Sequence, residues 1–92
     1  MTATLPTAPA ARTPVAVPLP ATAPGRAYAV QAVLGDDPIA HRLVACGLWV
    51  GALVERIGQA PFGDPLLFRL HGYRLALRAS EAARVLVVEA GS

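Results

Sequence analysis

The sequence predicts a mainly β fold, a small barrel of about five short strands with one inserted short α-helix and a helical turn before the last strand. Three observations predict it. Apolar and polar residues alternate with period two on both sides of His71-Gly72, which is typical of a β-hairpin. Glycine and proline punctuate short apolar runs. The chain is 54% hydrophobic but only 5% aromatic, so its core must come from small aliphatic side chains.

Length and charge limit the classes of function. With 92 residues, the chain is at most one domain. The net charge is +2, and all eight basic residues are arginines. These arginines are scattered from Arg12 to Arg84 rather than clustered with aromatic residues, so nucleic-acid binding is not expected.

Cysteine usage and hydropathy predict a cytoplasmic protein. Cys46 is the only cysteine, which excludes an intramolecular disulfide and fits a reducing compartment. No Lys or Arg precedes Arg12, and prolines interrupt the N-terminal region, so a signal peptide is not expected. The longest apolar run, residues 43–54, is far shorter than the roughly 18 residues of a membrane helix.

Composition divides the chain into a tail and a domain. Residues 1–25 are rich in alanine and proline and lack periodicity, which predicts a disordered tail. Residues 26–90 are expected to form the folded domain. A proline-rich ligand for a partner is the alternative function for the tail.

The first half of the domain predicts a strand and a helix. Residues 28–34 (YAVQAVL) favour a strand. Asp37 is a suitable N-cap and Pro38 a suitable first residue for a helix. Ile39, Leu43 and Cys46 follow at helical spacing, and Gly47 is expected to end the helix.

The second half predicts a strand over residues 51–60, a turn over residues 61–65, and a hairpin of strands 66–70 and 73–77. Residues 79–83 favour a helical turn, and residues 85–89 (VLVVE) a buried last strand. Five short antiparallel strands in meander order would most easily close as an SH3-like barrel.

The chain shows no pattern typical of an enzyme or of a cofactor site. Glycine-rich phosphate-binding motifs are absent, and Cys46 and His41 lie five residues apart, on different faces of the predicted helix. His41 and His71 have no ligand-type spacing to another His, Cys or carboxylate, so no metal site is predicted. Asp36, Asp37 and Asp64 are explained by capping and turns.

Residues 42–89 resemble the FeoA family, the small ferrous-iron transport protein A. The resemblance depends on Arg42-Leu43, Gly47-Leu48 with Gly51, the turn "APFGDP" at residues 60–65, Gly72, and "LRASEA" at residues 77–82. Val50 replaces a proline that is frequent in the family. The resemblance implies an SH3-like barrel without enzymatic activity. It also implies that the chain docks on the cytosolic GTP-binding region of the membrane transporter FeoB, and so contacts the membrane only indirectly.

Side-chain chemistry predicts the contact surface for such a partner. Trp49 is either a buried anchor or an exposed contact residue. We expect an apolar ridge with Phe62 nearby and outward arginines that steer toward an acidic surface. The predicted partner-binding residues are Leu48, Trp49, Val50, Phe62, Arg74 and Arg78.

Two alternatives stay open at this point. SH3-like barrels also occur as C-terminal domains of iron-dependent repressors, so a small metal-binding or metal-sensing domain, with His41 and His71 converging on a carboxylate, is the second hypothesis. An open edge strand would also make a homodimer possible.

Overall fold

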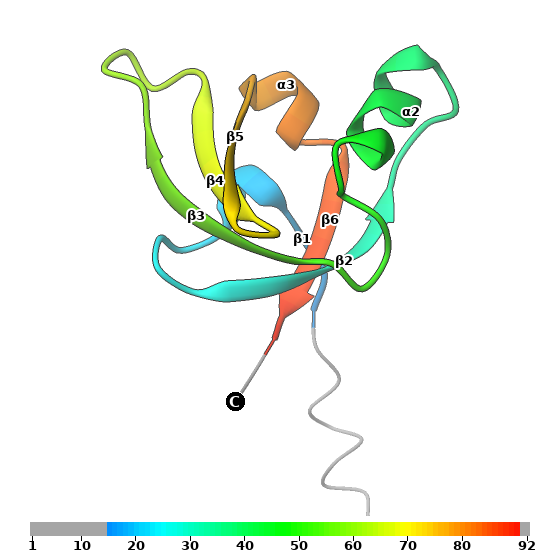
Figure 1. Ribbon diagram of the computed structural model, residues 1–92, viewed down its shortest axis with the longest axis horizontal. Helices are drawn as coiled ribbons and strands as arrows, with labels where there is room; N and C mark the ends of the chain where they lie inside the picture. Colours follow the sequence, from blue (N-terminus) through cyan, green and yellow to red (C-terminus); the bar gives the residue numbers. More distant parts are fainter. Residues whose placement is uncertain (1–14, 91–92) are drawn as a thin grey trace, which may run out of the picture.

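The computed structural model describes residues 15–90, which fold around one strongly coiled antiparallel sheet (Figure 1). Two short helices lie at one end of the sheet (Figure 1). In chain order the elements are β1 (Val17–Pro18), the 3-10 helix η1 (Leu19–Ala21), β2 (Ala27–Val33), α2 (Pro38–Ala45), β3 (Leu53–Gln59), β4 (Leu66–Leu70), β5 (Tyr73–Leu77), α3 (Ala79–Ala82) and β6 (Val85–Glu89).

The strand order across the sheet is β1-β6-β2-β3-β4-β5. The predicted meander is therefore present from β2 to β5, whereas β6 returns to pair with β2, on the side away from β3. Within residues 15–90, no strand pairing joins β5 to β1, so the coiled sheet is not closed. The mainly β, SH3-like fold class is confirmed, with six strands in place of five.

The hairpin and the helix form where the sequence predicts them. In the β4–β5 hairpin, Leu70 pairs with Tyr73, Phe68 with Leu75 and Leu66 with Leu77, which is the register of a two-residue turn. His71 and Gly72 form this turn with φ values of 53° and 83°. The side chain of Asp37 accepts a hydrogen bond from the amide of Ala40 at the start of α2.

The core fills the inside of the coiled sheet with aliphatic side chains around Phe68, which is fully buried. It draws on every strand except the two-residue β1, whose Val17 packs against it. The other large core side chains with less than 2% exposure are Leu19, Val30, Leu43, Leu48, Val54, Leu70, Val85 and Val87. Aliphatic residues therefore supply most of the burial, as the composition predicts.

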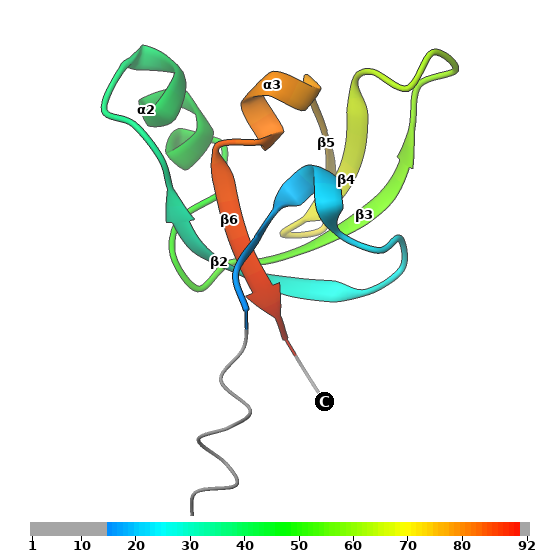
Figure 2. The same cartoon turned by 180° about the vertical axis from the view of Figure 1, so that it is seen from behind.

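The folded part begins earlier than residue 26. Val17 and Pro18 pair with Val87 and Leu86 of β6, and Figure 2 shows β1 running beside β6. Leu19 is 1% exposed, and the buried Thr22 hydroxyl donates to the Leu19 carbonyl. The sequence did not predict this segment, because a proline-rich composition usually indicates disorder. Prolines are nevertheless tolerated in an edge strand and in a short 3-10 turn. The expectation of disorder for residues 1–14 lies outside the described residues.

Replacing Leu19 by alanine tests whether this segment belongs to the fold. Leu19→Ala leaves a cavity in the core and should lower the free energy of unfolding by about 2–5 kcal/mol. Val15→Ala, at a side chain that is 77% exposed, is the control and should change it by less than about 0.5 kcal/mol. Urea denaturation followed by circular dichroism measures both, and equal effects of the two substitutions would contradict the assignment.

Candidate interaction surface

Helix α2 is attached to the sheet at both of its ends. At its N-terminus, the guanidinium of Arg84, just before β6, donates to both carboxylate oxygens of Asp37 over 2.6 and 2.8 Å. Arg84 also fills the space beside Gly35, where a Cβ would lie 2.8 Å from Nη1. Leu43 and Ala40 face the core. The helix is therefore held in one orientation against the sheet.

The bond from Arg84 changes the acidity of Asp37. The Arg84 hydrogen bond, helped by the amide of Ala40, lowers the pKa of the Asp37 carboxyl from 3.8 to about 2. The same pairing raises the pKa of Arg84. Both side chains are partly exposed, so we treat the pair as a positioning contact rather than as a major source of stability.

A second ion pair connects the two helices. Arg42 on α2 pairs with Glu81 on α3, whose side chain is 20% exposed. Glu81 also accepts a hydrogen bond from the backbone amide of Arg78 at the start of α3, and so caps this short helix. Asp64 accepts from the amide of Ala79 over 2.8 Å and thereby fixes the base of the turn at residues 60–65.

The C-terminus of α2 packs closely on the tip of the β4–β5 hairpin. Gly47 leaves the helix with a φ of 112°. His71 Nε2 lies 3.1 Å from the Gly47 carbonyl, and the Tyr73 hydroxyl donates to the Cys46 carbonyl. A Cβ at Gly47 would lie 2.8 Å from the His71 ring and 2.9 Å from the Tyr73 hydroxyl. Any other residue here would have to displace these two side chains and would adopt a strained positive φ.

An exposed aromatic cluster forms over this contact. The ring of Trp49 stacks on that of His71 with centroids 4.7 Å apart, and the ring of Tyr73 lies 6.3 Å from that of His71. Trp49 is 50% exposed and Tyr73 is 44% exposed. Val50 follows Trp49 and is 71% exposed. We call Trp49, His71 and Tyr73 the aromatic cluster.

The predicted ridge is therefore only partly present. Leu48 was expected on the contact surface, but it is fully buried, because the chain turns at Gly47 and sends this side chain into the core. Trp49 and Val50 are exposed as the contact hypothesis requires. Trp49 is consequently not a buried core anchor.

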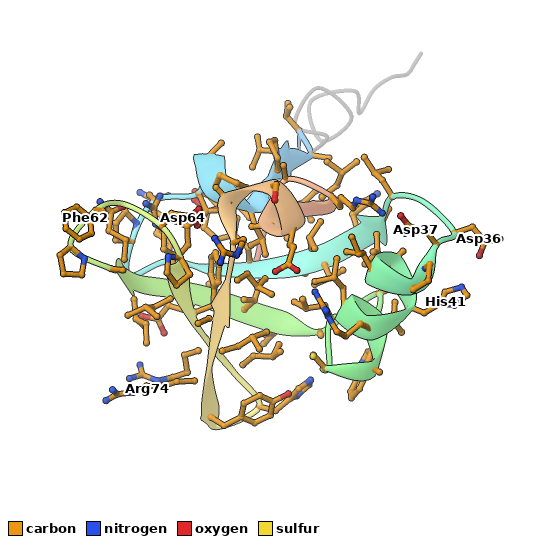
Figure 3. The ribbon with its side chains drawn as sticks, turned by 90° about the horizontal axis from the view of Figure 1, so that it is seen from above. Asp36, Asp37, His41, Phe62, Asp64 and Arg74 are labelled. Atoms are coloured by element: carbon orange, nitrogen blue, oxygen red, sulfur yellow. The ribbon has the colours of Figure 1, made fainter. Side chains whose placement is uncertain are left out.

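Phe62 does not lie near Trp49. It is 97% exposed in the turn between β3 and β4, at the end of the molecule opposite α2 (Figure 3). The expectation of one ridge that includes Phe62 is wrong for a physical reason. The β3–β4 hairpin is long and carries its turn away from the loop that follows α2 (Figure 1).

The two predicted steering arginines lie on strand β5 and just after it. Arg74 is exposed and points away from the sheet (Figure 3), and its strand partner is Arg69. Arg78 is exposed at the start of α3. Among residues 15–90, neither side chain forms an ion pair, whereas Arg69 lies 3.7 Å from Glu55.

The two histidines lie in different environments. His41 Nε2 lies 3.0 Å from Asp36 Oδ1 on the exposed side of α2, while His71 belongs to the aromatic cluster. The structure does not bring them together on one carboxylate. Within the described part of the chain, no group of three or more His, Cys, Asp or Glu residues could hold a metal ion.

Sequence reasoning missed His71 and Tyr73 as members of the surface. The positive φ of His71 is local information, but its contact with Gly47 joins positions 24 residues apart. No signal in a single sequence indicates that contact.

Among residues 15–90, no helix is long and apolar enough to cross a bilayer.

The coiled six-stranded sheet, with its short helices and exposed aromatic cluster, defines a small SH3-like β domain. The family model of the FeoA domain matches residues 17–89. This chain belongs to the FeoA family. No curated protein matches it.

Solved structures of FeoA proteins resemble the chain over most of its length. An iron uptake regulatory protein (FeoA) is 32% identical with a TM-score of 0.73, over 83% of this chain and 100% of the other. The zinc complex of Stenotrophomonas maltophilia FeoA is 35% identical with a TM-score of 0.68, over 77% and 88%. That protein is described as a prokaryotic SH3 domain protein and a proposed activating factor of ferrous iron transport.

Longer proteins contain the same fold. Iron(II) transport protein A from Clostridium thermocellum is 25% identical with a TM-score of 0.75, over 79% of this chain but 45% of the other. A manganese-dependent transcriptional repressor is 19% identical with a TM-score of 0.74, over 85% and 44%. At this identity the repressor shows a shared fold alone.

Alanine at Gly47 tests the close contact with the hairpin. Gly47→Ala adds a collision with His71 and Tyr73 to the strain of a positive φ. Gly51→Ala is the matched control, because its φ is 93° and a Cβ there meets no atom within 4 Å. Chemical denaturation should show Gly47→Ala to be less stable than Gly51→Ala by about 1–3 kcal/mol. Equal losses would show that the contact is loose.

The Asp37–Arg84 pair predicts a pH dependence. The pKa of Asp37 in the folded chain, about 2, lies below its usual 3.8, so its stabilising effect is complete above about pH 4 and is lost toward pH 2. Asp37→Asn should therefore be less stable than the wild type at neutral pH, and this gap should shrink as the pH falls from about 4 to 2. Chemical denaturation of both proteins between pH 2 and 7 measures this gap, and a gap that does not change with pH would contradict the role of the pair.

Proposed function

We propose that this chain is a non-enzymatic accessory protein of bacterial ferrous iron uptake. In this proposal it acts in the cytoplasm and docks on the cytosolic GTP-binding region of a FeoB-type transporter. Membership of the FeoA family supports the link to ferrous iron transport. The contact surface is proposed from the side chains of this chain alone.

The observation that carries the proposal is the exposed aromatic cluster. Large aromatic side chains that are half exposed and held in place are typical of residues that dominate binding energy at interfaces. Trp49 is held by its stack on His71, and Tyr73 by its hydrogen bond to Cys46. Both side chains are therefore ordered before a partner arrives, which reduces the entropy cost of binding.

The surroundings of the cluster support a docking role. Val50 extends the apolar surface next to Trp49, and Val44 on α2 is 41% exposed. Arg74 follows Tyr73 directly and has no acidic partner among the described residues, so it adds positive charge near this surface. An apolar centre with positive charge at its margin suits a partner that carries an acidic rim.

Trp49→Ala tests the proposal directly. The variant removes half-exposed surface without opening the core, so it should fold normally but bind the partner about tenfold or more weakly. Phe62→Ala is the matched control, because it removes an aromatic ring at the opposite end and should change affinity less than about twofold. Titration calorimetry with the isolated cytosolic domain of a cognate FeoB, with and without a GTP analogue, measures both.

Three outcomes of that experiment are informative. Loss of binding with Trp49→Ala alone would support the aromatic cluster as the contact surface. Equal loss with both variants would contradict its placement. No binding by the wild type, together with saturable NMR shifts at His41 and Asp36 on adding Fe²⁺, would contradict docking and support the metal-binding alternative.

A further inference from the structure

Strand β5 is an open edge of the sheet. Within residues 15–90 it pairs only with β4, because the strand order ends there. The opposite edge, β1, has two residues in the described part of the chain, and one of them is Pro18, which has no amide hydrogen. β5 has five residues, and most of them are exposed. It is therefore the edge at which another strand could be added.

The register of the hairpin shows which backbone groups are free. The positive φ values of His71 and Gly72 define a two-residue turn, in which the flanking residues Leu70 and Tyr73 form a hydrogen-bonded pair. Hydrogen-bonded and non-hydrogen-bonded pairs alternate along antiparallel strands. Arg74 and Ala76 therefore direct their amide and carbonyl groups away from β4. Both residues are exposed.

The two faces of β5 differ in chemistry next to this edge. Tyr73, Leu75 and Leu77 point to the inner face of the coiled sheet, yet Tyr73 is 44% exposed and Leu75 is only partly buried. In the described part of the chain no further strand pairs with β5, so the apolar surface of Tyr73 and Leu75 is incompletely covered. A residue added beside β5 on this face would find apolar neighbours.

The outer face is positively charged. Arg74 points to it, and Arg78, whose backbone is extended directly after the strand, continues the same alternation. Arg74 lies directly opposite Arg69, an arrangement of like charges that is unfavourable unless a further group neutralises it. Among the described residues, Arg74 and Arg78 form no ion pair, while Arg69 forms an ion pair with Glu55.

We propose that β5 is a strand-addition site for an extended segment of another protein in which apolar and acidic residues alternate. Its backbone would bond to the free groups of Arg74 and Ala76. Its apolar side chains would cover Tyr73 and Leu75, and its carboxylates would meet Arg74 and Arg78. This inference goes beyond the docking function proposed above, and its test needs no transporter.

A second copy of the chain fits the same edge less well. Residues 73–77 read YRLAL and contain no carboxylate. Antiparallel pairing of two β5 strands would bring the arginines of both copies to one face without an acidic partner. Charge complementarity therefore favours an acidic strand from a different protein.

The test uses a short synthetic peptide that alternates valine and glutamate, titrated into the ¹⁵N-labelled chain. We expect saturable shifts of the Arg74 and Ala76 amides, together with slower hydrogen exchange at both. Binding should weaken as salt is raised. A peptide with lysine in place of each glutamate should not bind. Equal binding of the two peptides, or no change at β5 at about 1 mM peptide, would overturn the proposal.

Two substitutions at Ala76 distinguish the contribution of its backbone amide to peptide binding from that of its side chain. Ala76→Pro removes an amide that does not bond to β4, so the hairpin should stay folded while affinity for the acidic peptide falls about fivefold or more. Ala76→Ser keeps the amide and should bind like the wild type. Equal affinities of the proline and serine variants would overturn strand addition. Concentration-dependent dimerisation that protects β5 without peptide would instead assign the edge to a second copy.

Discussion

The close approach between Gly47 and the tip of the β4–β5 hairpin is the constraint on which the surface of this protein depends. A glycine with a φ of 112° lets the chain leave α2 and pass against His71 and Tyr73 without a Cβ in the way. The turn sends Leu48 into the core and leaves Trp49 outside, stacked on His71. One backbone conformation therefore separates the core from the aromatic cluster.

The rest of the molecule supports that contact from both sides. The Asp37–Arg84 and Arg42–Glu81 pairs hold α2 against β6 and α3. β3 and the buried Phe68 hold the hairpin. The chain is too short to bury a large core, so even Leu19, before the first long strand, is needed inside. Because nearly every element contributes to this small core, the fold holds the exposed aromatic residues in a defined geometry, which suits a binding role.

Local sequence patterns predicted the parts of this architecture that depend on neighbouring residues. Alternation around His71-Gly72 indicated the hairpin, and Asp37-Pro38 indicated the start of α2. Contacts between distant segments could not be predicted in this way. The burial of Leu48, the distance of Phe62 from Trp49, and the contact of His71 with Gly47 all depend on how the hairpin and α2 meet. The strand at Val17–Pro18 was missed because proline-rich composition favours disorder unless a sheet edge accepts it.

The nuclear Overhauser spectrum of the free chain tests the central claim most directly. Trp49 is the only tryptophan, so its indole protons can be identified without ambiguity. The preformed aromatic cluster predicts cross-peaks between the indole protons of Trp49 and the ring protons of His71 before any partner is added. Cross-strand peaks between β4 and β5 without any Trp49–His71 peak would contradict the account. That result would show an intact hairpin that does not hold the surface in place.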